Sequence, residues 1–586
     1  MPTVKFNHSD LAKIQTRFGV EYSKKLLNDF GDIGCSVEEN DDNEIEIEIF
    51  PDRADLLSPG TLAHASRTFL HGHKSNPHLE IKSSGISLDV DASLRDVRPV
   101  IYAAVVRNVN TGENPEEINE FIQTIMDHQE KLHFSLGKRR SKASIGVHDF
   151  SELKPNFKVI TVDENFEFIP LAMNEKMKIK EILSEHPKGV DYAHLLEKVE
   201  KYPVIIDGND AVLSFPPIIN GNHTTVKNST KDFFIDVTGW DPRACECCLL
   251  LVCLELAARG GEIQSVEIND CEKRNIITPN GKAIKHELTE RLLKSMLGKD
   301  FSEEELSKAI NRMGGTYLGK HEAPSNSLEK SNKMSDIILG DKIIDIEMPR
   351  WRFDILHPID LVEEIAIGHG YEDLGKDVPK TPLSGSQLSS SNFTRRLTNC
   401  LQGLGLQQIT SLTLSNENDQ FNYVRWNEKE IATILANPIT VDHTLLRTNL
   451  LPGLLRLLNA NKHNELPQRI YELGEVVRNH SNETHASWLI ASPSGGFAEG
   501  RGMLQAIMRD MALDKFNIHY ELKETEENHG PWLKGRGAEI IVSGVKVGEI
   551  GEIDPHISKN FELSVPIHGA ELFLDRLKEL VQDPVH

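Results

Sequence analysis

Cysteine is scarce in this chain and follows no disulfide framework. The 586 residues contain 7 cysteines, an odd number, and four of them lie in the apolar segment 245–253 without a second Cys-x-x-Cys pair or a histidine partner. Buried structural thiols explain this cluster better than a metal site, which stays open as the alternative. The pattern is typical of a reducing compartment, so we expect a cytoplasmic protein.

Long hydrophobic runs are also missing. A membrane-spanning helix needs about 20 apolar residues, and the nearest candidate, residues 247–261, contains Glu255 and ends at a Gly-Gly pair. We expect a buried helix in this segment and no membrane partner. The polar, strand-like start of the chain shows no targeting signal.

Basic residues are outnumbered by acidic ones. The chain has 65 Lys and Arg against 89 Asp and Glu, which gives a formal net charge of −24. This balance argues against broad, nonspecific binding to nucleic acids but leaves room for a local basic patch. The best candidate patch, which is otherwise a solvated loop, consists of Lys138, Arg139, Arg140 and Lys142.

Residues 349–364 (PRWRFDILHPIDLVEE) are the most informative stretch. The preceding residues predict a strand over 341–355, which places Asp354 at its end. Pro358 then suits the first turn of a helix, where no amide donor is needed. The sequence therefore predicts a strand that leads into a helix.

That helix carries carboxylates at i, i+3 and i+4, which share one face. Like charges brought together repel strongly when desolvated, and a hard cation such as Mg²⁺ would relieve the repulsion. The alternative is a solvated acidic first turn that the helix dipole favours. The candidate metal ligands are Asp354, Asp360, Glu363 and Glu364.

Changes of pattern divide the chain into four segments, and we expect an α+β multidomain fold. Residues 1–84 form a small α/β module, residues 85–268 a mixed α/β domain, residues 269–375 a winged-helix-like domain, and residues 376–586 an antiparallel sheet domain. Polar residues 380–392 read as a linker.

Capping signals predict three helices within these segments. Asn114, followed by Pro115, starts a helix over 115–131. A helical apolar stripe predicts a second helix over 286–297. Ser302 with Glu305 forms a capping box for the third.

Several of these strings resemble the β subunit of phenylalanyl-tRNA synthetase of the archaeal and eukaryotic type. The resemblance covers nearly the whole chain with module order intact. Asp52 stands where the family string Pro-Asn-Arg-x-Asp-Leu-Leu-Ser has Asn. The strings that carry the resemblance are PDRADLLS, RFDI with DLVEE, ANPIT, LLRTNLLPGLL, RIYELGEVV, GRGAEI and VGEIGEIDP.

The resemblance implies a subunit of phenylalanine–tRNA ligase that forms an (αβ)₂ heterotetramer. The α subunit would hold the aminoacylation site for ATP and phenylalanine and would share the Mg²⁺ of the four acidic residues. The last segment would be a class II synthetase-like domain without catalytic residues, since Arg447 lacks a partner arginine and an acidic companion. The basic patch becomes a candidate contact for tRNA(Phe).

The resemblance also implies an editing domain over 85–268, and physics explains the need for one. An apolar pocket rejects an added hydroxyl only about 100-fold, so tyrosine would enter the phenylalanine site. A second site that hydrolyses Tyr-tRNA(Phe) would have to recognise the phenol. The candidate catalytic residues are Ser214, Asn220, Asp236 and Thr238, with Pro216, Pro217, Gly239, His148 and Asp149 nearby.

Three alternatives stay open. The Asp-Val-Thr-Gly string at 236–239 could be a turn or a cap. The chain could be a scaffold subunit that has lost editing. It could also be a regulator that binds DNA through the winged-helix-like segment, although that segment offers little basic surface.

Overall fold

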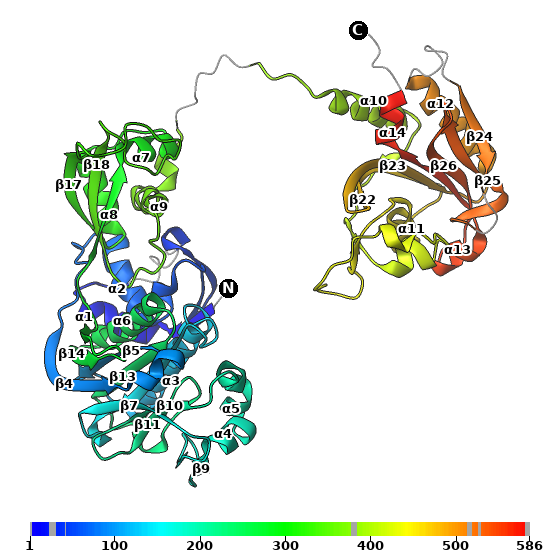
Figure 1. The fold of residues 1–586 in the computed structure, drawn as a ribbon. Coiled ribbons are helices and arrows are strands. Elements are labelled where there is room, and N and C mark those ends of the chain that lie inside the picture. Colours follow the sequence, from blue (N-terminus) through cyan, green and yellow to red (C-terminus); the bar gives the residue numbers. More distant parts are fainter. Residues whose placement is uncertain are drawn as a thin grey trace. The chain divides into compact units, whose positions relative to one another are not determined.

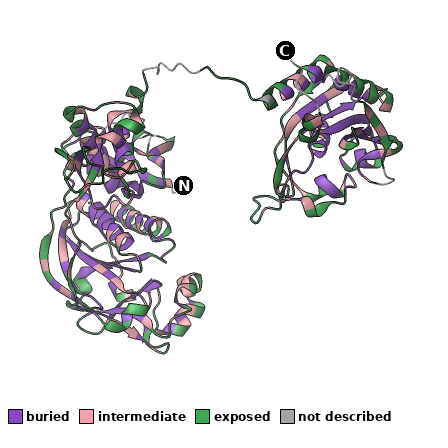
Figure 2. Ribbon diagram, turned by 45° about the horizontal axis from the view of Figure 1, so that its top comes forward, coloured by how far each residue is buried: buried purple, intermediate pink, exposed green. Residues whose placement is uncertain are grey.

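The computed structural model describes residues 3–22, 31–41, 43–376, 384–511, 519–525 and 529–580. The chain divides into two compact units, Met1–Pro379 and Lys380–His586 (Figure 1). Buried residues gather along the inner faces of helices and sheets in each unit (Figure 2). Among the described residues, no helix is both long and apolar enough to span a bilayer.

A small sheet in the order β1-β3-β2 opens the first unit. The predicted strand in this module is confirmed, because Ile45, Ile47 and Ile49 alternate with glutamates and are fully buried. The elements are β1 (Thr3–Asn7), α1 (His8–Arg17), β2 (Cys35–Asn40), β3 (Glu44–Ile49) and α2 (Pro59–Phe69).

A large sheet in the order β12-β11-β10-β7-β4-β14-β5-β13-β6 forms the centre of the first unit, with β15 paired to β14 (Figure 1). Helices α3 and α6 pack on one face. The elements are β4 (Lys82–Val90), β5 (Val100–Arg107), α3 (Pro115–Phe134), β6 (Ala143–Asp149), β7 (Phe157–Val162), β8 (Glu167–Phe168), β9 (Met177–Lys178), α4 (Ile179–Glu185), α5 (Pro187–Tyr192), β10 (Tyr202–Ile206), β11 (Val212–Phe215), β12 (Ile219–Asn220), β13 (Phe233–Gly239), α6 (Pro242–Ala258), β14 (Glu262–Asn269) and β15 (Asn275–Thr278).

Two predicted helices of this domain are confirmed. Asn114 Oδ1 accepts hydrogen bonds from the N–H groups of Glu116 and Glu117, and α3 follows with proline at its first position. Helix α6 is the predicted buried helix. Its cysteines are buried and free, and burial raises the pKa of Cys245 to about 12.

Successive side chains of strand β13 point to opposite faces of the sheet. Phe233, Ile235 and Val237 join the core beneath α3 and α6, whereas Phe234 joins the core on the opposite face. Asp236, one residue beyond Ile235, therefore shares the face of Phe234. This alternation places the Asp236 carboxylate among the buried side chains of the sheet.

The third module has the sheet order β16-β18-β17. The expected helix over 286–297 is wrong in its first turn, because residues up to Thr289 pair with β18 and the Thr289 hydroxyl caps the helix. The Ser302–Glu305 capping box is confirmed. The elements are β16 (Ile284–Thr289), α7 (Glu290–Leu297), α8 (Glu303–Arg312), β17 (Thr316–Glu322), β18 (Lys342–Met348) and α9 (Pro358–His369).

The strand predicted over 341–355 is also too long. Strand β18 ends at Met348, directly before Pro349, which has no N–H to donate to the sheet. Asp354 consequently lies in the connection between β18 and α9. The predicted start of the helix at Pro358 is confirmed.

The second unit is built on an antiparallel sheet in the order β22-β23-β27-β26-β25-β24, to which the short β19 adds in parallel. Trp488 and Ile490 pack with α10, α12 and α14, whereas Leu489 and Ala491 pack with α11 and α13. The elements are α10 (Ser389–Gly403), β19 (Gln407–Gln408), β20 (Leu414–Ser415), β21 (Leu445–Leu446), α11 (Leu451–Ala460), β22 (Gln468–Arg478), β23 (Ser481–Ala491), α12 (Phe497–Asp510), β24 (Tyr520–Glu524), β25 (Trp532–Val542), β26 (Val545–Ile553), α13 (Pro555–Asn560), β27 (Ile567–Phe573) and α14 (Leu574–Leu580).

A buried charged cluster ties α11 to this sheet. The Glu571 carboxylate accepts hydrogen bonds from the N–H groups of Leu450 and Leu451 at 2.9 and 3.0 Å, and His485 Nδ1 lies 2.7 Å from it. Burial lowers the pKa of His485, but hydrogen bonds to Glu483 and Glu571 outweigh burial and raise the pKa above its ordinary value.

This raised pKa predicts a pH-dependent stability. The contribution of His485 is fully present below about pH 6.5, the pKa of an unfolded histidine, and is lost as pH rises through the higher pKa of the folded state. We expect His485→Gln to remove this component, measured by urea unfolding of the full chain from about pH 6 to about pH 9. His556→Gln, at a 92% exposed side chain, is the control. An unchanged pH slope in His485→Gln would contradict the prediction.

Candidate functional site

A cavity of about 410 Å³ lies where the two ends of the large sheet approach each other. Residues of β6 and β12 line it together, and Asn220 Nδ2 lies 3.5 Å from the Val147 carbonyl oxygen across the gap. Helix α3 adds apolar side chains to the wall. The apolar lining residues are Phe121, Ile122, Ile125, Met126, Ile145, Val147, Leu171, Pro216, Pro217, Ile218, Ile219, Val226 and Phe233.

Three of the four predicted catalytic residues line this cavity, although they come from distant parts of the chain. Ser214 of β11, Asn220 of β12 and Asp236 of β13 are all in its wall. Asp236 is 1% exposed and its Oδ2 atom lies 2.7 Å from His148 Nε2. A buried carboxyl group in hydrogen-bond contact with His148 is thereby set into a mainly apolar chamber.

Thr238 lies behind this wall. Its hydroxyl accepts a hydrogen bond from Arg98 Nε at 2.8 Å and lies 2.9 Å from Ser144 Oγ. Asp149 likewise points away and accepts hydrogen bonds from Ser151 and Thr230. The hydrogen bonds of Thr238 and Asp149 therefore support the structure around the cavity.

Arg98 is the main residue that sequence reasoning missed. It is 3% exposed, and it donates to Thr238, to Ser144 Oγ and to the Arg140 carbonyl. Burial lowers its pKa to about 10, while the charges of Cys245 and Asp236 act in the opposite direction. An arginine within an apolar stretch, VRPVIYAAVV, is the signal that could have identified it.

The basic patch forms a turn between α3 and β6. Lys138, Arg139 and Arg140 all adopt positive φ angles. Lys138, Arg139 and Lys142 are exposed, whereas the buried Arg140 donates to the carbonyl groups of Pro217 and Ile218 and pairs with Glu130 at 2.6 Å. Arg140 thus builds the cavity wall, and the exposed cations lie beside it in sequence.

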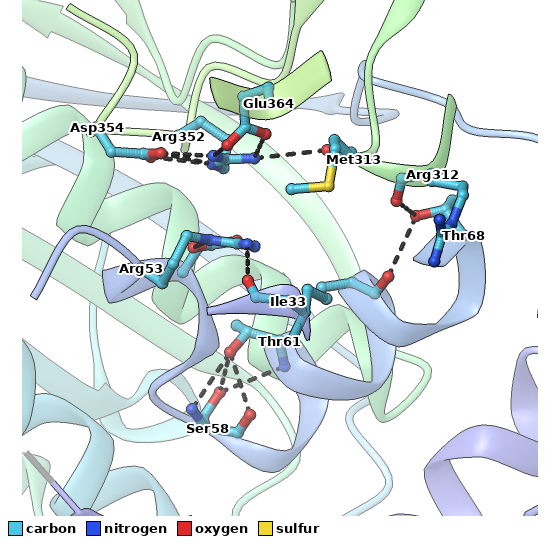
Figure 3. A network of polar contacts seen from close by, with 12 residues as sticks. Ile33, Arg53, Ser58, Thr61, Thr68, Arg312, Met313, Arg352, Asp354 and Glu364 are labelled. Carbon is cyan, nitrogen blue, oxygen red and sulfur yellow. Dashed lines mark hydrogen bonds and ion pairs between the residues drawn. The ribbon is translucent and has the colours of Figure 1, made fainter. Parts of the chain in front are cut away.

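The four predicted metal ligands occupy different roles. Arg352, 4% exposed, binds both the Asp354 carboxylate and the Glu364 carboxylate, the latter at 2.6 and 2.7 Å (Figure 3). Asp360 Oδ2 accepts hydrogen bonds from two backbone N–H groups at the start of α9. Glu363 is exposed, and its pKa is raised by partial burial and by neighbouring carboxylates.

A cation therefore fits this cluster in part. The neighbours that raise the pKa of Glu363 are Asp52, Asp360 and Asp354, so positive charge would be favourable beside it. Arg352 already neutralises Asp354 and Glu364. In the described part of the chain, the group of three potential ligands whose atoms all lie within 4.8 Å of one another is instead Glu287, His321 and Asp345.

The expectation that Arg447 lacks an acidic companion is wrong. Arg447 is buried, and its Nη1 atom lies 2.8 Å from the Glu472 carboxylate and 2.9 Å from Ser411 Oγ. The guanidinium also donates to the Glu475 carbonyl. Glu472 could not be recognised from the sequence because it lies 25 residues from Arg447 and meets it only in the fold.

Comparisons with known proteins agree with this architecture. Three family models match: "B3/4 domain" over 97–246, "tRNA synthetase B5 domain" over 286–371 and "Phenylalanyl tRNA synthetase beta chain CLM domain" over 374–574. A crystal structure of an N-terminal fragment of the phenylalanyl-tRNA synthetase beta-subunit from Pyrococcus horikoshii has a TM-score of 0.54 and 28% identity, and it covers 63% of this chain and 100% of the fragment. These matches support a mixed α/β multidomain fold.

Full-length relatives extend the match. The phenylalanine–tRNA ligase beta subunit of Methanosarcina acetivorans is 37% identical over 577 residues, 98% of this chain and 99% of the relative. The beta subunit of Archaeoglobus fulgidus is 35% identical over 547 residues, 92% of this chain and 93% of the relative. The resemblance found in the sequence is confirmed: this chain belongs to the phenylalanine–tRNA ligase beta subunit family and is a component of that ligase.

Proposed function

We propose that this chain hydrolyses Tyr-tRNA(Phe) in the cavity between β6 and β12, and that the aminoacylation site belongs to its α partner. The observation that carries the proposal is the position of the buried Asp236 in the wall of a cavity that is lined mainly by apolar side chains. An aromatic ring fits the apolar walls, and the carboxylate accepts a hydrogen bond from a phenol hydroxyl.

This arrangement favours tyrosine over phenylalanine. Phenylalanine would bury Asp236 without offering it a hydrogen-bond donor, and an unpaired buried polar group is costly. Sites that hydrogen-bond a substrate hydroxyl discriminate far more strongly than apolar pockets do. An apolar aminoacylation site distinguishes tyrosine from phenylalanine poorly. We expect this cavity to distinguish them well.

Ser214 and Asn220 are the proposed groups that position the ester and the attacking water, because they line the same cavity as Asp236. Correct placement alone contributes much of the rate in such a reaction. Thr238 supports the wall through Arg98 and Ser144. Lys138, Arg139 and Lys142, together with Arg140 at the wall, are the proposed tRNA contacts.

The second unit is proposed to bind the α subunit within an (αβ)₂ tetramer rather than to bind ATP. Arg447 supports this, since its guanidinium is engaged by Glu472, Ser411 and Glu475. The complex would use ATP and Mg²⁺ in its α subunit.

Two assays on the purified chain and on the αβ complex test the proposal. Phenylalanine-dependent ATP–pyrophosphate exchange should require the complex, and Tyr-tRNA(Phe) should be deacylated much faster than Phe-tRNA(Phe). Exchange by the chain alone would place a synthetic site in this subunit. Exchange by the complex without deacylation would favour the scaffold alternative.

The acidic helix yields a separate prediction about assembly. We propose that Mg²⁺ binds at the α interface through Glu363 and Asp360, with Asp354 and Glu364 completing the set. Glu363→Gln, or chelation by EDTA, should then weaken αβ association about 10-fold or more, measured by analytical ultracentrifugation. Glu372→Gln, a nearby exposed carboxylate, is the control. Unchanged αβ association after both treatments would support the alternative interpretation, in which these carboxylates form a solvated acidic first turn of the helix.

A further inference from the structure

His148 is a fully buried histidine that touches the cavity only through another residue. It lies on β6 opposite Phe234 of β13. Its Nε2 atom lies 2.7 Å from Asp236 Oδ2 and its Nδ1 atom lies 2.8 Å from Thr224 Oγ1. Both ring nitrogens are therefore engaged, one of them with the proposed recognition carboxylate.

The hydrogen bonds place one proton between His148 and Asp236. The Thr224 hydroxyl has a single proton, which it gives either to the Gly221 carbonyl at 3.1 Å or to His148 Nδ1 at 2.8 Å. In the first case Nδ1 carries a proton and a further proton lies between Nε2 and Asp236 Oδ2, and in the second case the ring proton lies on Nε2. Either way, the 2.7 Å contact between Nε2 and Asp236 Oδ2 contains one proton.

That proton has two possible locations with the same consequence. If it sits on Nε2, the ring donates to the Asp236 carboxylate. If it sits on Asp236 Oδ2, the carboxylic acid donates to the ring. In both cases Oδ1 remains a hydrogen-bond acceptor.

The neighbouring backbone is shaped around this pair. Gly146 lies opposite Asp236 in the strand register. A methyl group added at Gly146 would lie 2.2 Å from Asp236 Oδ2 and 2.7 Å from His148 Nε2. The space above Gly146 is thus occupied by the hydrogen bond itself, and only glycine permits it.

We propose that His148, held by Thr224, is a positioning residue for editing. It fixes Asp236 Oδ2 and supplies a shared proton, so that Oδ1 always presents an acceptor to the hydroxyl of a tyrosyl ester. The inference rests on the proposed editing function and assigns the selectivity of the cavity to a Thr224–His148–Asp236 chain rather than to Asp236 alone.

The test measures deacylation of Tyr-tRNA(Phe) and Phe-tRNA(Phe) by the αβ complex with variants of Thr224. Thr224→Val removes the hydroxyl that holds His148 Nδ1, and we expect about a 10-fold loss of selectivity for the tyrosyl ester. Thr224→Ser keeps the hydroxyl and should restore selectivity to within about two-fold, which a purely structural role of the methyl group would not predict. Thr161→Val makes the same chemical change on β7, where the Thr161 hydroxyl lies 2.9 Å from Ser93 Oγ in an exposed hydrogen bond.

Gly146→Ala is the second variant, because it separates Asp236 from His148 without removing either group. We expect it to lower selectivity at least as far as Thr224→Val does, with phenylalanine charging retained. If the wild-type complex deacylates Tyr-tRNA(Phe) and both variants match it, the positioning inference is overturned while the editing function stands. A wild-type complex without deacylation would overturn both.

Discussion

Replacing Asp236 with alanine is expected to slow deacylation of Tyr-tRNA(Phe) by about 100-fold, because a hydrogen bond to a charged group contributes roughly 1.5–3 kcal/mol and each 1.4 kcal/mol is about tenfold in rate. Phenylalanine charging should be nearly unchanged, since that site is proposed to lie in another subunit. Single-turnover hydrolysis of purified Tyr-tRNA(Phe) by the complex measures the first quantity, and steady-state aminoacylation measures the second.

Two matched variants make the Asp236 result interpretable. Asp127→Ala removes an exposed carboxylate from α3 outside the cavity and should leave both activities at the wild-type level. Thr238→Ala should have a smaller effect than Asp236→Ala, because Thr238 lies behind the wall and acts through Arg98 and Ser144. Equal losses of phenylalanine charging and of Tyr-tRNA(Phe) deacylation in Asp236→Ala would contradict the assignment of Asp236 to an editing site.

The composition of the cavity shows what the sequence could and could not reveal. Ser214, Asn220 and Asp236 were found because they lie in strings that resemble a known family. Their convergence depends on closing a sheet whose end strands are separated by some 70 residues, as the Asn220–Val147 contact shows. No local pattern encodes such a closure. The partners Arg98, which lies just before β5, and His148, which lies on β6, come from other parts of the chain for the same reason.

Sequence signals for the start of a helix were reliable where a side chain close in sequence caps the free N–H groups of the first turn. The Asn114 cap and the Ser302–Glu305 capping box both appeared as predicted. The expected helix over 286–297 was wrong in its first turn because a strand register with β18, a non-local interaction, overrode the helical apolar stripe. The correct boundary is set by Thr289, whose hydroxyl accepts from the Leu292 N–H.

Arg352→Met is expected to be the most destabilising substitution considered for the first unit. It leaves Glu364, 5% exposed, without its guanidinium partner, and an uncompensated buried charge costs about 3–5 kcal/mol. Arg352 also links the connection after β18 to the Met313 carbonyl of the α8 end, beside Arg53 of the N-terminal module (Figure 3). Scanning calorimetry of the full chain should show the loss as a lower transition temperature.

The double variant Arg352→Met with Glu364→Leu separates lost packing from lost charge compensation. Removing both partners of a buried ion pair is often nearly neutral, so the double variant should recover much of the stability that the single variant loses. If both variants are equally unstable, the guanidinium acts mainly through its contacts to Asp354 and Met313.

The response of Arg352→Met to Mg²⁺ decides how the salt bridges relate to cation binding. In the wild-type chain Arg352 already neutralises Asp354 and Glu364, which leaves Glu363 and Asp360 to bind a cation. Arg352→Met frees Asp354 and Glu364 as well, so millimolar Mg²⁺ should raise its transition temperature more than it raises that of the wild type, since a ligand that binds only the folded state stabilises it by RT ln(1 + [L]/Kd). Adding Glu363→Gln to Arg352→Met should remove most of that gain. A transition temperature that does not respond to Mg²⁺ in Arg352→Met would show that these carboxylates serve the arginine network alone.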